Sequence, residues 1–223
     1  DVESESLGCN HPSVGFTLMT KGNLHLQLNQ IDQAIKDCRD AIEILKKGLG
    51  HIHPEVGRAM MRLADIYNYH SIGDWESDKD TARSLYQASL IPLSETFGSV
   101  NPHLALANNS IGIIYALKND TKNAMKSFYD ALVGYGVKTR ADDEESSCTP
   151  LSSDVFFVWI NVGDLHSKRN EWQLALRSFQ KACNLFRSLN DSQKDYLRKI
   201  GPRRMMRLAT SKSRLSFDDD ETL

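Results

Sequence analysis

The chain has 223 residues, of which 40% are hydrophobic and 25% charged, and its formal net charge is −2. A charge this close to zero provides no overall field that would draw the chain to nucleic acid or to an anionic membrane. The sequence contains no apolar run of about 18 residues, so it predicts no membrane span. We therefore expect neither a nucleic-acid partner nor an integral membrane protein.

The four cysteines, Cys9, Cys38, Cys148 and Cys183, lie far apart and form no C-x-x-C pair. Zinc sites and redox dithiols of the common kinds use closely spaced thiols, so this spacing argues against both. Scattered single thiols are typical of proteins from a reducing compartment. We therefore expect a cytoplasmic location.

A short motif recurs along the chain. HPSV at His11 returns as HPEV at His53, 42 residues later, and as NPHL at Asn101, 48 residues after that. A fourth copy, SSDVFF around Asp154, lacks the proline. Each copy starts a helix-length apolar pattern, which is followed by a polar break and a second such pattern. Proline is favoured in the first turn of a helix, so it marks a helix start in the first three copies. The two apolar patterns that follow each of the four copies predict a pair of helices.

Small and aromatic residues recur in register within these pairs. The middle of each first helix has a small residue, followed by an aromatic residue or histidine: Gly22 and His25, Ala64 and Tyr67, Gly112 and Tyr115, Gly163 and His166. Each second helix has three regularly spaced positions: Ala34, Cys38 and Ala41; Ala82, Tyr86 and Ser89; Ala124, Phe128 and Ala131; Ala175, Phe179 and Ala182. Small residues let two helix backbones approach closely, and aromatic residues at helical spacing fill the space beside them. We therefore predict helical hairpins packed through their small residues.

The pattern IGIIY…A…F…A at residues 111–131 resembles the tetratricopeptide repeat (TPR). The 42-residue period exceeds the ~34 residues usual for that repeat. With the HP motif and the Leu49-Gly50 pair before it, the pattern is similar to the longer repeats of kinesin light chains. The resemblance extends over about residues 11–189. It implies an all-α fold: a right-handed α-solenoid of about four helical hairpins and a C-terminal capping helix.

The sequence divides as follows: residues 1–10, the tail of an upstream repeat or a linker; repeats at about 11–50, 53–98, 101–137 and 154–189; a capping helix at 190–202; and a tail at 203–223. The tail is basic and then acidic, a pattern typical of disordered segments, with an electrostatic docking segment as the alternative. Two surface insertions are expected, one in the turn of the second repeat and one at residues 139–153.

No residue pattern indicates catalysis, a cofactor or a metal. The one close histidine pair, His51 and His53, has no third ligand nearby and is better explained by the HP motif. The acidic run from Asp142 to Glu145 lacks the spaced oxygens and glycine of a calcium loop. Glycine-rich phosphate loops and nucleophile motifs are also missing from the sequence. We therefore expect a protein that is not an enzyme.

The resemblance implies that the first helices of the repeats line a concave groove that binds a protein or peptide. The candidate groove residues are Phe16, Met19, Asn23, Arg58, Met61, Asp65, Asn68, Asn109, Ile113, Phe157, Ile160 and Asp164. Only Arg58 is basic among them, which does not fit the TPR modules that clamp a C-terminal carboxylate. An extended or helical peptide with apolar anchors fits better. The alternative is that several of these side chains pack against neighbouring repeats.

Two functions follow from this interpretation. The first is an adaptor or scaffold module that binds a partner protein in the groove. The second is a regulatory or oligomerisation segment of a larger protein that resembles a kinesin light chain. The sequence leaves self-association open.

Overall fold

A computed structural model describes residues 10–70, 72–138 and 153–200 of the chain. The regular elements in these ranges are all helices. The predicted upstream tail at residues 1–9, most of the 139–153 insertion and the C-terminal tail lie outside the described residues.

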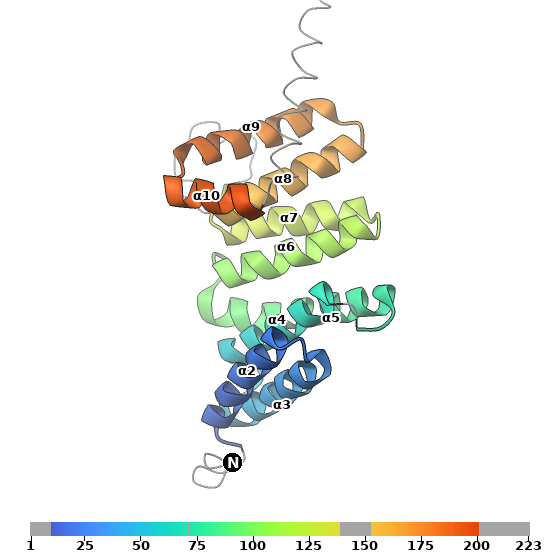
Figure 1. The fold of residues 1–223 in the computed structure, drawn as a ribbon. Helices are drawn as coiled ribbons and strands as arrows, with labels where there is room; N and C mark the ends of the chain where they lie inside the picture. The colour runs from blue at the N-terminus through green and yellow to red at the C-terminus, as the bar shows by residue number, and fades with distance from the viewer. Residues whose placement is uncertain (1–9, 71, 139–152, 201–223) are drawn as a thin grey trace, which may run out of the picture.

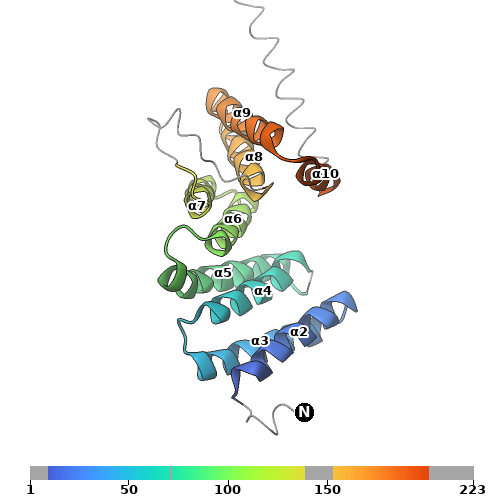
Figure 2. The ribbon, with the colours of Figure 1, turned by 90° about the vertical axis from the view of Figure 1, so that its left-hand side faces the viewer.

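The helices form four consecutive hairpins and a final single helix (Figure 1). The hairpins are α2 (Pro12–Gln27) with α3 (Ile31–Leu49), α4 (Pro54–Tyr69) with α5 (Trp75–Phe97), α6 (Pro102–Leu117) with α7 (Thr121–Gly134), and α8 (Ser153–Lys168) with α9 (Trp172–Ser188). The last helix is α10 (Asp191–Ile200). We call the first helix of each hairpin its A helix and the second its B helix. The A helices lie on one side of the stack and the B helices on the other (Figure 2), which confirms the predicted α-solenoid.

Each hairpin closes where a small residue of the A helix faces the middle of the B helix. A Cβ atom placed on Gly112 would lie 2.6 Å from Cδ1 of Phe128, and one on Gly163 would lie 2.5 Å from Cε1 of Phe179. In the first hairpin the same position is Gly22, and a Cβ atom placed on it would lie 3.1 Å from the sulfur of Cys38. The aromatic ring therefore occupies the volume that a side chain on the facing helix would need, as the sequence pattern predicted.

A second close approach lies two helical turns earlier in the A helices. A Cβ atom on Gly15 would lie 2.8 Å from Cγ of Leu45, and one on Gly57 would lie 3.1 Å from the carbonyl oxygen of Ser89. In the third hairpin Ala105 occupies this position, and the small residue facing it is Gly134, where a Cβ atom would lie 2.9 Å from that of Ala105. These small residues repeat with the same spacing as the mid-helix ones. This second set of small residues, Gly15, Gly57 and Ala105, was therefore recognisable in the sequence, although the predicted pattern used only the mid-helix set.

The turns between A and B helices use asparagine in the left-handed conformation. Asn29, Asn119 and Asn170 have φ angles of 58°, 61° and 60°. Asparagine tolerates this region better than other residues with a side chain, because its short polar side chain can bond locally. Each of the three turns is short, so the B helix starts directly beside the end of its A helix.

The second hairpin has the longer turn that the sequence predicted, and buried charges organise it. The carboxylate of Asp78 accepts hydrogen bonds from the backbone N–H groups of Ile72 at 3.2 Å and Gly73 at 3.0 Å. The adjacent Lys79 is also buried and donates to the side-chain oxygen of Asn68 at 2.9 Å. These contacts join the start of α5 to the end of α4, so the longer turn is held to its hairpin.

The HP motif starts helices. The Nδ1 atom of His53 accepts a hydrogen bond from the backbone N–H of Glu55 at 3.3 Å, and His11 does the same for Ser13. In the third repeat the side-chain oxygen of Asn101 accepts from the N–H of His103 at 2.8 Å. Each residue therefore caps N–H groups that have no partner within the helix.

We expect Gly112→Leu to destabilise the third hairpin, because Phe128 already fills the space beside Gly112. Overpacking of this kind costs about 1–3 kcal/mol. Thermal unfolding followed by circular dichroism should show a lower melting temperature. The matched control is Gly73→Leu, since a Cβ atom on Gly73 meets nothing within 4 Å. Equal melting temperatures for the two variants would show that the Gly112 contact does not limit stability.

Replacing His53 tests the helix cap. His53→Ala removes the acceptor and should lower the free energy of unfolding by about 1 kcal/mol, whereas His53→Asn should retain most of it. Chemical denaturation measures both changes, with His51→Ala at an exposed neighbouring position as the control. A loss of stability in His53→Asn as large as in His53→Ala would argue against the cap.

Candidate partner-binding surface

The four A helices present one continuous side of the stack (Figure 2). We call the residues that this side displays the A-helix surface. The exposed large apolar side chains of the A helices include Phe16 on α2 at 43% and Leu106 on α6 at 42%, and Leu24, Tyr69 and Leu117 are exposed as well. Phe16 and Leu106 occupy equivalent positions in the first and third repeats, one turn before Met19 and Asn109.

The structure divides the predicted groove residues by accessibility. Those buried in the packing of the helices are Met19, Met61, Asn68, Phe157 and Ile160. Those partly exposed are Asn23, Arg58, Asp65, Asn109, Ile113 and Asp164, and Phe16 is exposed. Met19 and Met61 belong to one core cluster, and Phe157 and Ile160 to another. Met19, Met61, Asn68 and Ile160 therefore support the helices, and the accessible residues are left to contact a partner. Phe157 is buried although Phe16, at the equivalent position of α2, is exposed.

Polar contacts join neighbouring A helices across this surface. Arg62 of α4 donates to the side-chain oxygen of Asn23 on α2 at 2.9 Å. Asn161 of α8 donates to the side-chain oxygen of Asn109 on α6 at 3.1 Å. Two of the three asparagines predicted to contact a ligand, Asn23 and Asn109, therefore already hold the next repeat in place. Arg62, which is exposed one turn after Arg58, is a contact residue that the sequence pattern did not predict.

A buried tyrosine connects the second and third hairpins. The hydroxyl of Tyr86, whose side chain is fully buried on α5, donates to the carboxylate of Asp65 on α4 and is also hydrogen-bonded to Ser110 on α6. Burial raises the pKa of Asp65, while the bond from Tyr86 and the charge of Arg62 act in the opposite direction. The carboxylate of Asp65 is therefore committed to the packing of three helices.

Arg58 lies at the start of α4, where it pairs with a residue of its own helix. Its guanidinium is 2.7 Å from the carboxylate of Glu55. Across from it on α6, the pKa of His103 is lowered by burial and then by the charge of Arg58. The two arginines of α4, Arg58 and Arg62, are balanced by Glu55 and Asp65 of the same helix.

The two histidines at the aromatic position lie against carboxylates of their own hairpins. His25 Nδ1 lies 2.7 Å from Asp37, and His166 Nδ1 lies 2.6 Å from Glu171. The tyrosines of the other two repeats contact the preceding B helix instead, Tyr67 through Arg39 and Tyr115 through Gln87. The position therefore serves a contact within the hairpin in the first and fourth repeats and a contact between repeats in the second and third. Among the described residues, these contacts of the two histidines include no nucleophilic side chain.

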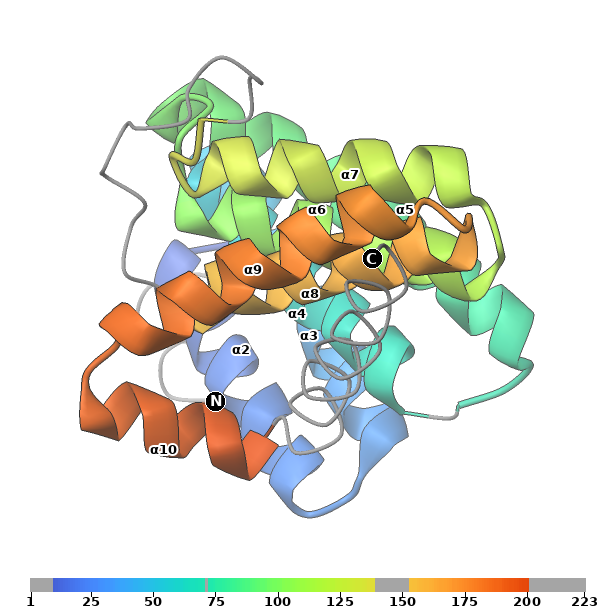
Figure 3. The ribbon, with the colours of Figure 1, turned by 90° about the horizontal axis from the view of Figure 1, so that it is seen from above.

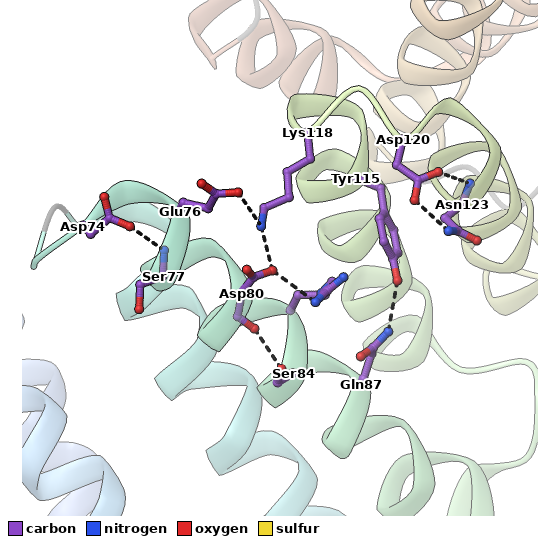
Figure 4. Close-up of polar contacts among 11 residues, drawn as sticks. Asp74, Glu76, Ser77, Asp80, Ser84, Gln87, Tyr115, Lys118, Asp120 and Asn123 are labelled. Carbon is purple, nitrogen blue, oxygen red and sulfur yellow. Dashed lines mark hydrogen bonds and ion pairs between the residues drawn. The ribbon is translucent and has the colours of Figure 1, made fainter.

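A separate depression lies along the first half of α5. It has a volume of about 700 Å³ and is lined by Glu76, Ser77, Asp80, Thr81, Ser84 and Leu85. Lys118, which directly follows α6, reaches Asp80 at 2.7 Å, and Arg83 lies 3.1 Å from the same carboxylate (Figure 4). Hydrogen bonding from Lys118 is the main reason that the pKa of Asp80 is lowered. Because Asp80 is paired in this way, we assign these contacts to the joint between α5 and α6.

Within the described ranges, no group of three or more histidine, cysteine, aspartate or glutamate side chains is arranged to hold a metal ion. None of the helices in those ranges combines the length and apolarity required to cross a membrane.

Comparisons with known proteins agree with this architecture. A family model for the tetratricopeptide repeat matches residues 17–55. KINESIN LIGHT CHAIN-RELATED 2 of Arabidopsis thaliana is 24% identical over 161 residues, which are 72% of this chain and 23% of that protein. KINESIN LIGHT CHAIN-RELATED 1 of the same plant is 23% identical over 163 residues, 72% of this chain and 25% of that protein. The chain thus spans about a quarter of the length of these relatives.

Solved structures support the fold. BtubC (BKLC) from P. vanneervenii superposes with a TM-score of 0.63 at 18% identity, covering 78% of this chain and 64% of that one. A Podosopora anserina chain of nearly identical TPR-like repeats, assigned to the kinesin light chains, gives a TM-score of 0.59 at 12% identity, covering 92% and 98%. The stacked hairpins and the matched stretch are similar to those of TPR proteins. Among TPR proteins, this chain resembles the kinesin light chains.

The buried Asp65 predicts a pH dependence. Its pKa is raised in the folded protein above the ordinary value of 3.8, so the folded state binds this proton more tightly than the unfolded state does. The resulting stabilisation is present at low pH and is lost as the pH rises from 3.8 through the higher folded pKa. Urea denaturation over this window should show the parent losing stability relative to Asp65→Asn. Asp32→Asn, at an exposed position, is the control. A difference between parent and Asp65→Asn that does not vary with pH would contradict this assignment.

Proposed function

We propose that the chain is a protein-interaction module that binds a peptide or helix of a partner protein on its A-helix surface. TPR proteins bind protein partners, and the kinesin light chains that this chain resembles are typically interaction modules without enzymatic activity. The observation that carries the proposal is the exposure of Phe16 and Leu106 at equivalent positions of α2 and α6. Exposed apolar side chains on a rigid helical frame are suited to become buried when a partner binds.

The surroundings of these two side chains favour a ligand that contacts several hairpins. Arg58 and Arg62 on α4 lie on the helix between α2 and α6, and Ile113 is partly exposed on α6. A peptide that lies across these helices would place apolar side chains on Phe16 and Leu106 and polar groups near the arginines. The carboxylate of Asp65 contributes little to recognition, because Tyr86 already donates to it.

The proposed cellular role is that of an adaptor or scaffold in the cytoplasm. Cys38 and Cys183 are free thiols. Cys38 is buried, and burial raises the pKa of its thiol to about 11, which keeps it protonated and unreactive. A buried thiol used as a small apolar side chain is compatible with a reducing compartment.

The test uses helical peptides selected from a display library against the full chain and measured by titration calorimetry. Phe16→Ala together with Leu106→Ala should weaken binding at least tenfold, because burial of a large apolar side chain contributes about 1.5–3 kcal/mol and each 1.4 kcal/mol is about tenfold. The matched control is Ile91→Ala with Val133→Ala, which removes two exposed apolar side chains from the B helices α5 and α7. Selected peptides that lose affinity only for the control variant would place the binding surface on the B helices and contradict the proposal.

A further inference from the structure

Helix α10 does not continue the stack beyond α9. In Figures 1 and 2 it lies beside α8, on the side of the molecule formed by the A helices, and the view from above in Figure 3 agrees. The link from α9 consists of Leu189, which is buried, and Asn190. The chain therefore turns back immediately after the last hairpin, toward the side of the A helices.

A reciprocal cap fixes the start of α10. The backbone N–H of Asn190 donates to the side-chain oxygen of Gln193 at 3.2 Å, and the N–H of Gln193 donates to the side-chain oxygen of Asn190 at 2.9 Å. This arrangement is a capping box, in which the two side chains satisfy backbone N–H groups at the start of the helix. The helix therefore starts at a defined point beside α8.

Helix α10 is attached through its apolar face. Leu197 is 0% exposed and belongs to the same core cluster as Phe157 and Ile160 of α8. On the other face Asp191, Ser192 and Asp195 are exposed. The helix is thus a short amphipathic segment whose leucine is inserted among apolar residues of the hairpin stack.

The burial of Phe157 shows that the end of the A-helix surface formed by α8 is covered. Phe16, Leu106 and Phe157 occupy the same position in the first, third and fourth repeats, and their exposed fractions are 43%, 42% and 9%. A following hairpin does not cause this burial, since α2 and α6 each have one and their residues remain exposed. The element that α8 has on this side, and that α2 and α6 lack, is α10.

We infer that α10 is an intramolecular ligand of the A-helix surface. It occupies the end formed by α8 through Leu197, and a partner helix reaches Phe157 only after α10 has left. This inference rests on the proposed function, because it assigns to α10 a part of the same surface. It also specifies the class of ligand that the α8 end accepts: a short amphipathic helix with a leucine anchor.

The experiment adds α10 back to the protein as a separate peptide. Leu197→Ala in the full chain weakens the attachment of α10, and a fluorescein-labelled peptide of residues 189–200 is then titrated. A short tether gives an effective concentration on the order of millimolar, so the titration must extend to that range. The dissociation constant for Leu197→Ala should be at least tenfold lower than that for the parent, in which α10 competes. Leu174→Ala, at an exposed leucine of α9, is the matched control and should behave as the parent.

Two further variants locate the binding site. In the Leu197→Ala background, Phe157→Ala should abolish peptide binding, whereas Phe16→Ala at the other end of the surface should leave it unchanged. Circular dichroism verifies that each variant is folded, and a peptide with alanine in place of Leu197 should not bind.

The inference is overturned if folded Leu197→Ala binds the peptide no better than the parent, or if Phe157→Ala leaves binding intact. Either result would make α10 a structural cap only. The selected peptides that test Phe16 and Leu106 would still report on the proposed function, because that assay does not depend on Leu197.

Discussion

The structure depends on the close approach of two helices within each hairpin. An aromatic ring of the B helix lies against a glycine of the A helix at Gly112 and Gly163, at distances that leave no volume for a Cβ atom. Because the contact leaves no free volume, it fixes both the separation of the two helices and their register. The direction in which each hairpin presents its remaining faces to the next hairpin follows from this geometry. The polar contacts between repeats depend on this geometry.

The sequence predicted this contact because its chemistry is local and repeats. A small residue at Gly112 and an aromatic one at Phe128 can be recognised from spacing alone, and their partners in the other copies confirm the register. The helix starts were predictable for the same reason, since His53-Pro54 and Asn101-Pro102 each combine a capping side chain with a proline of the first turn. The role of the histidine Nδ1 atom as the acceptor became clear only from the structure.

The candidate site was less predictable, since accessibility depends on how successive hairpins rotate against each other. Spacing places Met19, Phe16 and Ile160 on the same stripe of their helices, but Met19 and Ile160 are buried and Phe16 is exposed. The contacts of Asn23 and Asn109 were also not predictable from spacing. Asn23 is bonded to a residue 39 positions later, and Asn109 to one 52 positions later. The amphipathic pattern of α10 showed that one face is apolar, and it contained no information on which helix that face would cover.

The contacts of Arg62 with Asn23 and of Asn161 with Asn109 each join one hairpin to its immediate neighbour. A stack connected in this way behaves like a chain of hinged plates, in which bending at one joint is not resisted by plates further away. A ligand that contacts both Phe16 and Leu106 would bridge the first and third hairpins and act as a splint across the joints between them. Binding would then stiffen the solenoid along its length, and the stack would transmit mechanical load better with its partner than without it.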